Sequence, residues 1–369
     1  MAAKQVLITG ADGYLGFRLA RKHLELTQDR VLLWIRASTE DAFRMKRENL
    51  ARRLSAFEGR VSYRAGDLTA QNPFDAVDPK NIRSIIHAAA VTRFNVDGAT
   101  ARQVNIGGAE KVFDFAARCP ALEGLGLLST VYASGLKTGM IQETPLGDHE
   151  GFSNHYERSK WESETVLIKR FGHLPWRIFR LATVIADNDD GRVTQQNAFH
   201  NTLKLFYYGL LSLIPGNPTT PLYFVTGDFA TRAIFDLMQS PLNRAIYHVS
   251  HTKDESLCLD ELINLAAGTF EQDRDFKTRR VLKPIYADLE SFNLLVGEVS
   301  AFGGGVVNQA IGSVAPFARQ LFLHKEIGNR NLVSALADYH APDPRRLAQN
   351  TCRYMVQTNW GKSVPHENP

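Results

Sequence analysis

The stretch Val6–Gly16, with the sequence VLITGADGYLG, decides the fold of this chain of 369 residues. It opens with a short apolar run typical of a buried strand, and its glycines follow the spacing G-x-x-G-x-x-G. Gly10 suits a tight turn, Gly13 lets the backbone approach a pyrophosphate, and Gly16 lets the next helix pack closely on the sheet. The pattern predicts a dinucleotide-binding turn, and a tight strand-to-helix turn without a ligand is the alternative.

The helix after this turn should run over Tyr14–Leu26, with the amide groups of Tyr14 and Leu15 facing phosphates at its positive end. Short apolar runs then alternate with helical stretches through the first half of the chain. The expected strands are 31–35, 61–65, 85–90, 125–129 and 177–181, and the expected helices include 100–118 and 156–171. This alternation predicts the α/β class: a Rossmann-type, doubly wound parallel sheet with helices on both faces.

The pattern changes after about residue 187, which divides the chain into two expected parts. Residues 1–185 should form the nucleotide-binding core, and residues 186–369 a smaller, mostly helical substrate lobe. Within the second part, a strand at Leu222–Val225, a helix from about Asp228 and a strand at Ile246–Ser250 suggest that about 222–250 return to the core. The apolar stretch Val299–Phe322 is expected to be a buried lobe helix; a pocket cover, a membrane contact or a partner contact are the alternatives.

Composition excludes several classes of protein. The net charge is +4 with 43 basic and 39 acidic residues, and no basic stripe interleaved with aromatic residues predicts nucleic-acid binding. The three cysteines, Cys119, Cys258 and Cys352, form neither a CxxC pair nor a disulfide framework. There is no signal-peptide pattern and no apolar run of membrane-spanning length, so we expect a cytoplasmic protein without a membrane span. The histidines lack metal-ligand spacing, and no metal site is predicted.

The ends of the next strands indicate which cofactor is bound. Arg36 follows the second expected strand, where a cation would pair with a 2′-phosphate, so NADP is favoured over NAD, with Ser38 as a helper. Asp67, followed by Leu68, ends the third strand and is either an acceptor for the adenine amino group or a turn cap. The small residues Ala88 and Ala89 at the fourth strand end would let the cofactor lie close to the backbone.

A candidate catalytic group lies further along the chain. Lys160 follows Tyr156 by four residues, so both would share one helix face, and an ammonium near a phenol lowers its pKa. The same ammonium can hydrogen-bond the nicotinamide ribose, so Lys160 is also a predicted cofactor-binding residue. The fifth strand ends at Ser129 and Thr130, which brings a hydroxyl into the same crevice as a donor to a developing oxyanion. The alternatives are a surface tyrosine beside a solvated lysine, and hydroxyls that cap a turn.

With these motifs in this order, the sequence resembles the extended short-chain dehydrogenase/reductases over about its first 185 residues. Phrases such as TGADGYLG, IIHAAAVTRFN, LLSTVYASG and YERSKWESE are most similar to the thioester-reductase and fatty acyl-CoA reductase branch, the male sterility type. The resemblance implies that Thr130 orients the substrate, Tyr156 donates the proton and Lys160 assists it. It also assigns Asn105 to a proton-relay water, with helix capping or packing as the alternative. One departure is Arg180-Leu181, where the family often has Arg-Pro.

These expectations lead to an NADP-dependent reductase of carbonyl carbon, acting on an acyl thioester to give an aldehyde or alcohol. The thioester would arrive on CoA or on a separate carrier protein, because no carrier or adenylation segment precedes the core. A ketone or aldehyde reductase, a nucleotide-sugar epimerase and a non-catalytic NADP sensor are the alternatives. Monomer and homodimer are both open.

Overall fold

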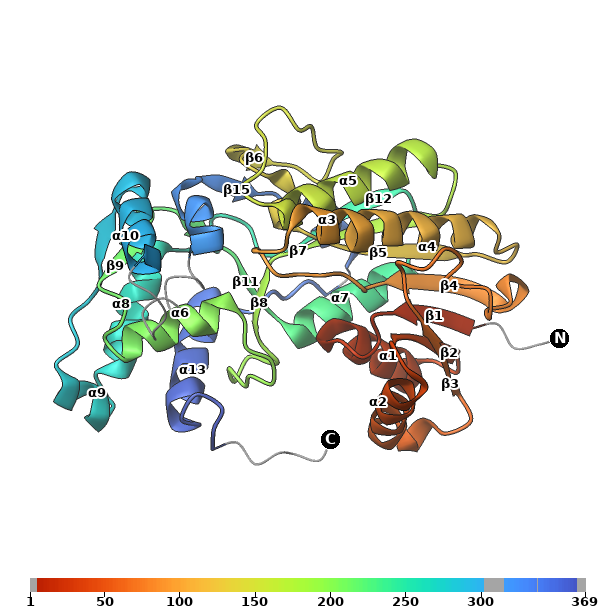
Figure 1. Ribbon diagram of the computed structural model, residues 1–369, viewed down its shortest axis with the longest axis horizontal. Helices are drawn as coiled ribbons and strands as arrows, with labels where there is room; N and C mark the ends of the chain where they lie inside the picture. The colour runs from red at the N-terminus through yellow and green to blue at the C-terminus, as the bar shows by residue number, and fades with distance from the viewer. Residues whose placement is uncertain (1–4, 302–314, 337, 364–369) are drawn as a thin grey trace.

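The computed structural model describes residues 5–301, 315–336 and 338–363. Its centre is a sheet of seven parallel strands in the order β12-β7-β5-β4-β1-β2-β3 (Figure 1). The strands are β1 (Gln5–Thr9), β2 (Arg30–Arg36), β3 (Val61–Gly66), β4 (Ile82–His87), β5 (Gly124–Thr130), β7 (Trp176–Leu181) and β12 (Ala245–Val249). The order reverses at β1, so the ends of β1 and β4 form the crevice where such sheets bind ligands.

Helices cover both faces of the sheet, as doubly wound folds require. One layer holds α1 (Tyr14–Leu26), α2 (Glu40–Arg53) and α7 (Gly227–Gln239); the other holds α3 (Gly98–Thr100), α4 (Gly107–Ala117) and α5 (His155–Arg170) (Figure 1). Within β1, Val6 and Ile8 belong to the core under α1 and α7, while Leu7 belongs to the core under α4. This alternation explains why the strands read as continuous apolar runs, and it confirms the predicted fold class.

Most of the remaining elements form a smaller lobe at one end of the sheet (Figure 1, left). Its core gathers aromatic side chains such as Phe206, Phe270 and Trp360. The lobe helices are α6 (Ala198–Tyr207), α8 (Leu259–Phe270), α9 (Arg274–Arg279), α10 (Leu289–Ala301) and α13 (Pro344–Gln357), whereas α12 (Arg330–Ala335) packs on β12 of the central sheet. Short strand pairs are β6 (Gly139–Ile141) with β15 (Lys325–Ile327), β8 (Thr183–Ala186) with β11 (Phe224–Thr226), β9 (Leu213–Pro215) with β14 (Ile285–Ala287), and β10 (Pro221–Leu222) with β13 (Leu257–Cys258).

Two expected elements differ from the structure, and a third lies mostly outside the described residues. The helix expected over 100–118 has a π-helical segment, Ala101–Ile106, before α4 begins. The strand expected at 222–225 is wrong as a single strand, because β10 and β11 pair with different partners outside the main sheet. Most of the apolar stretch 299–322 lies outside the described residues. No helix in the part of the chain that is described is long and apolar enough to cross a membrane.

Candidate active site

The glycine turn has the close packing that its spacing predicts. Gly10 adopts a positive φ of 69°, and a Cβ there would lie 2.7 Å from the Ala89 nitrogen. A Cβ on Gly16 would lie 2.1 Å from the Gly10 carbonyl oxygen, so both positions require glycine. At Gly13 a Cβ would meet only that same oxygen, at 3.1 Å. Gly13 therefore borders space rather than packed protein, which suits the approach of a pyrophosphate.

The N-terminus of α1 lacks a capping side chain. Its N-cap is Gly13, no side chain accepts a hydrogen bond there, and its first turn holds no acidic residue. By contrast, Thr39 caps α2 and Asn154 caps α5 through their side chains. The amides of Tyr14 and Leu15 are thus left for another acceptor, and a helix start of this kind favours an anion. These residues fit the pyrophosphate of a dinucleotide.

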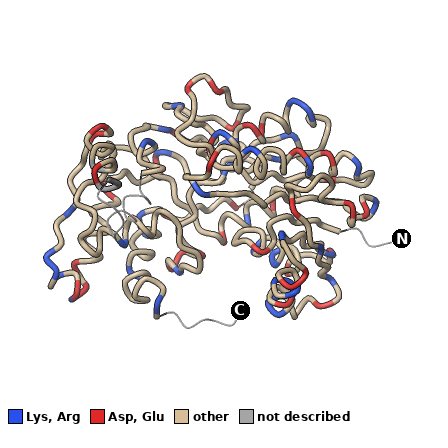
Figure 2. The backbone as a smooth tube through the Cα atoms, viewed as in Figure 1, with Lys and Arg blue, Asp and Glu red and all other residues tan. Residues whose placement is uncertain are grey.

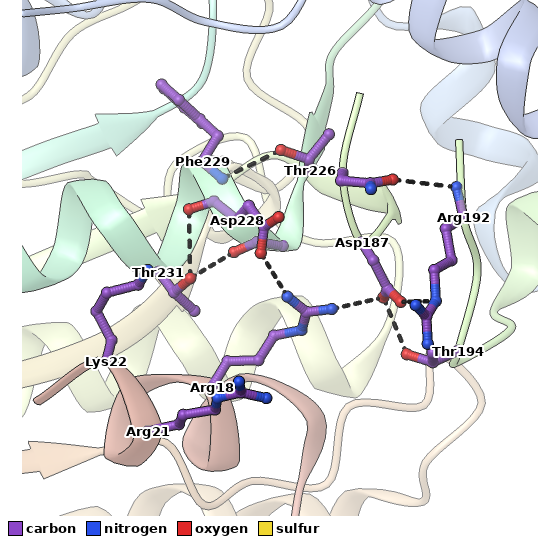
Figure 3. A network of polar contacts seen from close by, with 12 residues as sticks. Arg18, Arg21, Lys22, Asp187, Arg192, Thr194, Thr226, Asp228, Phe229 and Thr231 are labelled. Carbon is purple, nitrogen blue, oxygen red and sulfur yellow. Dashed lines mark hydrogen bonds and ion pairs between the residues drawn. The ribbon is translucent and has the colours of Figure 1, made fainter. Parts of the chain in front are cut away.

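The side chain of Tyr14 points away from this turn into a polar network. Its hydroxyl donates to Asp187 at 2.7 Å, and burial together with that bond raises the pKa of the phenol. Arg18, one turn further along α1, bridges Asp187 at 2.9 Å and Asp228 at 2.6 Å (Figure 3). The network ties α1 to the segment after β8 and to the start of α7. The Tyr14 side chain therefore fixes the helix, and the predicted contact with a cofactor would involve only its backbone amide.

At the ends of β2 and β3 the two charged residues predicted to contact a cofactor meet each other. Arg36 Nε lies 3.5 Å from Asp67 Oδ2, and the Arg36 side chain is 67% exposed. Asp67 Oδ1 accepts from the amide and hydroxyl of Thr69, so Asp67 is also the turn cap that was the alternative. Ser38 is exposed just before α2. A cation that solvent and a ligand can reach therefore lies at the edge of the crevice, where the sequence predicts the adenosine part of the cofactor.

Lys46 also lies at this edge, although its sequence position does not predict it. Its ammonium donates to Asp12 in the glycine turn and to the Arg36 carbonyl, each at 2.7 Å. Helix α2, which carries it, has both basic and acidic residues along its length (Figure 2). Only the packing of α2 brings this particular lysine to the turn.

The fourth strand end is packed tightly on the first. The amides of Ala88 and Ala89 lie against the Thr9 carbonyl and hydroxyl, at 3.3 and 3.4 Å. His87 shares a hydrogen bond of 2.8 Å with Thr9, and burial lowers the pKa of the imidazole to about 3, with Lys160 contributing. Leu68 is buried beneath α4. These small or buried residues form the floor of the crevice.

Tyr156 and Thr130 come together at the carboxyl end of the sheet. Tyr156 lies in the first turn of α5 and is 8% exposed, and Thr130 is the last residue of β5. Burial raises the pKa of the Tyr156 phenol, and the nearby Thr130 hydroxyl opposes the rise. The ring of Phe94 stands edge-on to Tyr156 at 5.5 Å. A neutral phenol and a hydroxyl are thus paired where a carbonyl oxygen would need two donors.

Lys160 lies one turn after Tyr156 on α5 and is 8% exposed. Its ammonium donates to the Leu128 carbonyl at 2.9 Å. Burial lowers the pKa of Lys160 to about 8, and the negative charge of Glu164 opposes that shift. The influence of Lys160 on His87 places its charge near the floor of the crevice.

Asn105 lies in the π-helical segment and is 3% exposed. Its side chain accepts from the Val91 amide at 2.8 Å and donates to the Val91 carbonyl at 3.0 Å and to Ser159 at 2.9 Å. The amide group therefore joins the loop after β4 to α5, which is the packing role named as the alternative. Its role with a proton-relay water stays a prediction.

A cavity of about 1030 Å³ lies beside the start of α5. Phe94, Val96 and Trp161 supply apolar walls, and Arg158 and Arg319 are exposed at its lining. Because Phe94 contacts both this cavity and Tyr156, the cavity adjoins the candidate catalytic group. The sequence did not point to these residues, since they come from the loop after β4, from α5 and from the lobe and meet only in the folded chain.

Known proteins resemble the chain in sequence and in fold. Fatty acyl-CoA reductase 2, chloroplastic, of Arabidopsis thaliana is 29% identical over 185 residues, which cover 43% of this chain and 30% of that protein. The chain thus matches less than a third of that relative's length. The terminal R domain from the myxalamid PKS-NRPS biosynthetic pathway shares the fold, with a TM-score of 0.77 and 20% identity over 97% of this chain and 91% of that one. A thiolation-reductase di-domain from an archaeal non-ribosomal peptide synthetase has a TM-score of 0.74 and 17% identity, over 98% and 76%.

The profile of the male sterility protein family, a family of NAD-binding domains, matches residues 8–234. That range spans the glycine turn, the strand ends and both catalytic candidates on β5 and α5, so the match covers the site as well as most of the sheet. Because it also covers more than half of the chain, this protein belongs to the male sterility family of nicotinamide-dinucleotide-binding domains, with the extended short-chain dehydrogenase/reductase fold.

Proposed function

We propose that this protein reduces the carbonyl carbon of an acyl thioester with NADPH, giving an aldehyde or an alcohol. The observation that carries the proposal is the convergence of Thr130, the last residue of β5, and Tyr156, in the first turn of α5, at the end of the sheet. The pair lies at the same sheet edge as the uncapped N-terminus of α1. The sequence similarity to a fatty acyl-CoA reductase supports the thioester as substrate.

The residues of the site have separate tasks in this reaction. A bound nicotinamide supplies the hydride. Thr130 donates a hydrogen bond to the carbonyl oxygen, and Tyr156 gives that oxygen its proton as negative charge develops there. The Lys160 ammonium stabilises the resulting phenolate. The hemithioacetal then expels its thiol with a proton and leaves an aldehyde, and a second hydride and proton convert the aldehyde to an alcohol.

We assign NADP rather than NAD to the cofactor site. Arg36 is exposed at the end of β2, where its guanidinium can exchange Asp67 for a 2′-phosphate, and Lys46 adds a second cation nearby. Replacing Arg36→Gln should weaken NADPH binding on the order of tenfold or more and leave NADH binding nearly unchanged. Equal losses for the two cofactors in fluorescence titrations would argue against this assignment.

The substrate portion of the site is assigned to the cavity beside α5. Its aromatic walls suit an acyl chain, and its exposed arginines suit a phosphate-bearing thiol such as CoA or a carrier-bound pantetheine. The similarity in fold to a thiolation-reductase di-domain is compatible with a carrier-bound substrate.

A panel assay tests the proposed function. NADPH oxidation, with NADH alongside, would be followed against acyl-CoA thioesters of several lengths, free long-chain aldehydes and ketones. We expect turnover of thioesters with release of free thiol. Turnover of aldehydes or ketones alone would make the protein a carbonyl reductase. Bound NADPH with no turnover of any substrate would favour a sugar-nucleotide enzyme or a non-catalytic sensor.

A further inference from the structure

A buried cation from the lobe, Lys325, contacts the turn that follows Thr130. Lys325 on β15 is 7% exposed, and its ammonium donates to the Ser134 hydroxyl at 3.0 Å and to the Gly135 carbonyl at 2.5 Å. Ser134 ends the 3-10 turn Val131–Ser134, which begins directly after Thr130. Lys325 therefore holds the segment that carries a candidate catalytic hydroxyl.

A buried anion lies next to the other candidate catalytic group. Glu157 follows Tyr156 on α5 and is fully buried. Its carboxylate accepts from the Ser153 amide at 3.0 Å, the Asn154 side chain at 3.0 Å and the Gln320 side chain at 2.8 Å. The hydrogen-bond donors to Glu157 thus come from the residues just before α5 and from the lobe.

Lys325 and Glu157 are linked through shared hydrogen-bond partners. The Gln320 amide nitrogen that donates to Glu157 also lies 3.3 Å from the Gly135 carbonyl oxygen, to which Lys325 donates. Burial lowers the pKa of Lys325 and raises the pKa of Glu157, and the attraction between the two charges opposes both shifts. Such a pair is stable in a protein interior only when both partners are present.

The backbone around Lys325 is itself fixed. Lys325 and Ile327 on β15 pair with Gly139 and Ile141 on β6, and the Tyr223 hydroxyl donates to the Lys325 carbonyl at 2.7 Å. Ile327 packs in one apolar cluster with Val131. The segment 320–327 is thus seated as a unit against both the turn and the helix.

We infer that Lys325 and Glu157 are positioning residues. They lock the turn after Thr130 to the start of α5, so that Thr130 and Tyr156 can both contact one carbonyl oxygen. The lobe thereby completes the active site. The inference rests on the proposed reductase function. Neither side chain touches the reacting atoms; the charged or titratable groups that face Glu157 are Lys325, Tyr132 and Tyr156.

Kinetics of matched variants test the inference. Lys325→Met and Glu157→Gln should each lower kcat per cofactor-binding site on the order of 10- to 100-fold, because small misplacements of catalytic groups reduce rates by such factors. NADPH affinity should stay within about twofold of the parent. The double variant should lose no more than either single one, since the two residues act as a unit. The control is Glu326→Gln on the same strand, whose partner Lys253 is exposed.

Two outcomes would overturn the inference. One is an unchanged kcat per cofactor-binding site with only a lower Tm, which marks a merely structural role. The other is independent, multiplicative losses from the two single variants. If Lys325→Met fails to fold, Lys325→Arg and the double variant provide the same comparison.

A second measurement does not depend on turnover. Backbone amide exchange should speed up in both 131–137 and 153–157 in Lys325→Met, and in neither segment in Glu326→Gln. A parent enzyme silent on the whole substrate panel would contradict the proposed function alone. Unchanged exchange in the two segments would contradict the lock itself.

Discussion

The chemistry assigned to Tyr156 depends on the surroundings of one hydroxyl. Burial raises the pKa of the phenol, so it carries its proton at neutral pH, as a donor in a reduction must. The nearby Thr130 hydroxyl favours the phenolate that remains after transfer. The burial comes from Phe94, Val96 and Ala101, which pack in one apolar cluster with Tyr156.

Replacing Tyr156→Phe should therefore abolish turnover without affecting cofactor binding. We expect kcat to fall on the order of 10²- to 10⁴-fold, the contribution typical of a positioned general acid. Tyr132→Phe is the matched control, because the Tyr132 ring also lies edge-on to Phe94, while its hydroxyl is bonded to Thr183. Similar rates for the two variants in the thioester assay would remove Tyr156 from the mechanism.

The charge of Lys160 leads to a prediction about how NADPH affinity depends on pH. Burial lowers its pKa to about 8, so the ammonium is present below that pH and is lost as the pH rises through it. A polyanionic dinucleotide binds the charged form better, so NADPH affinity should fall as the pH is raised from 7 to 9. Lys160→Met should flatten this dependence and the exposed Lys169→Met should not. A parent protein with constant affinity over that range would argue against a contact between the Lys160 ammonium and the cofactor.

At the scale of elements, one stripe of α5 joins the catalytic residues to a buried ion pair. Tyr156, Lys160 and Glu164 follow each other at intervals of four residues on this helix. Glu164 accepts from Ser129 on β5 and forms an ion pair of 2.7 Å with the fully buried Arg180 on β7. Arg180 thus holds α5 against the sheet.

Removing this arginine should destabilise the fold strongly. Arg180→Met leaves the Glu164 carboxylate buried without its cation, and the free energy of unfolding should fall by about 3–5 kcal/mol. Arg232→Met, which breaks the exposed pair of Arg232 and Asp236, should change it by at most about 1 kcal/mol. Urea denaturation measures both, and equal midpoints for the two variants would disprove the difference.

At the scale of the whole molecule, buried histidines set the response to acid. Burial lowers the pKa of His87 and His248 to about 3 and that of His200 to about 4. The unfolded chain, with histidine pKa values near 6.5, binds these protons first as the pH falls. The stability that depends on these histidines being neutral is therefore fully present above about pH 6.5, and it is lost progressively as the pH falls below that value.

We accordingly expect the free energy of unfolding to fall steeply between pH 6.5 and 5. Each of these histidines contributes up to about 1.4 kcal/mol per pH unit in that window. His200→Asn should reduce the slope by one such contribution, and the exposed His173→Asn should leave it unchanged. Denaturant titrations at several pH values measure the slope, and a flat profile in the parent protein would contradict the argument.

Local patterns determined much of this protein from its sequence. The glycine turn, helix α1 and the strands of the sheet are encoded by neighbouring residues, because turn chemistry and apolar runs act over short distances along the chain. The positions of Thr130 and Tyr156 followed from the same rules, since parallel strands end at one edge. The boundary near residue 185 and the relay role of Asn105 stay predictions.

Only the tertiary structure decided which charges meet. Lys325 and Ser134 are 191 residues apart in the chain, and the contact of Lys46 with Asp12 depends on how α2 packs. Likewise, the break at Tyr223 between β10 and β11 reflects two different strand partners rather than any change in local pattern. Such contacts are decided by burial and long-range packing, where an unpaired charge is too costly to persist, and no local spacing encodes them.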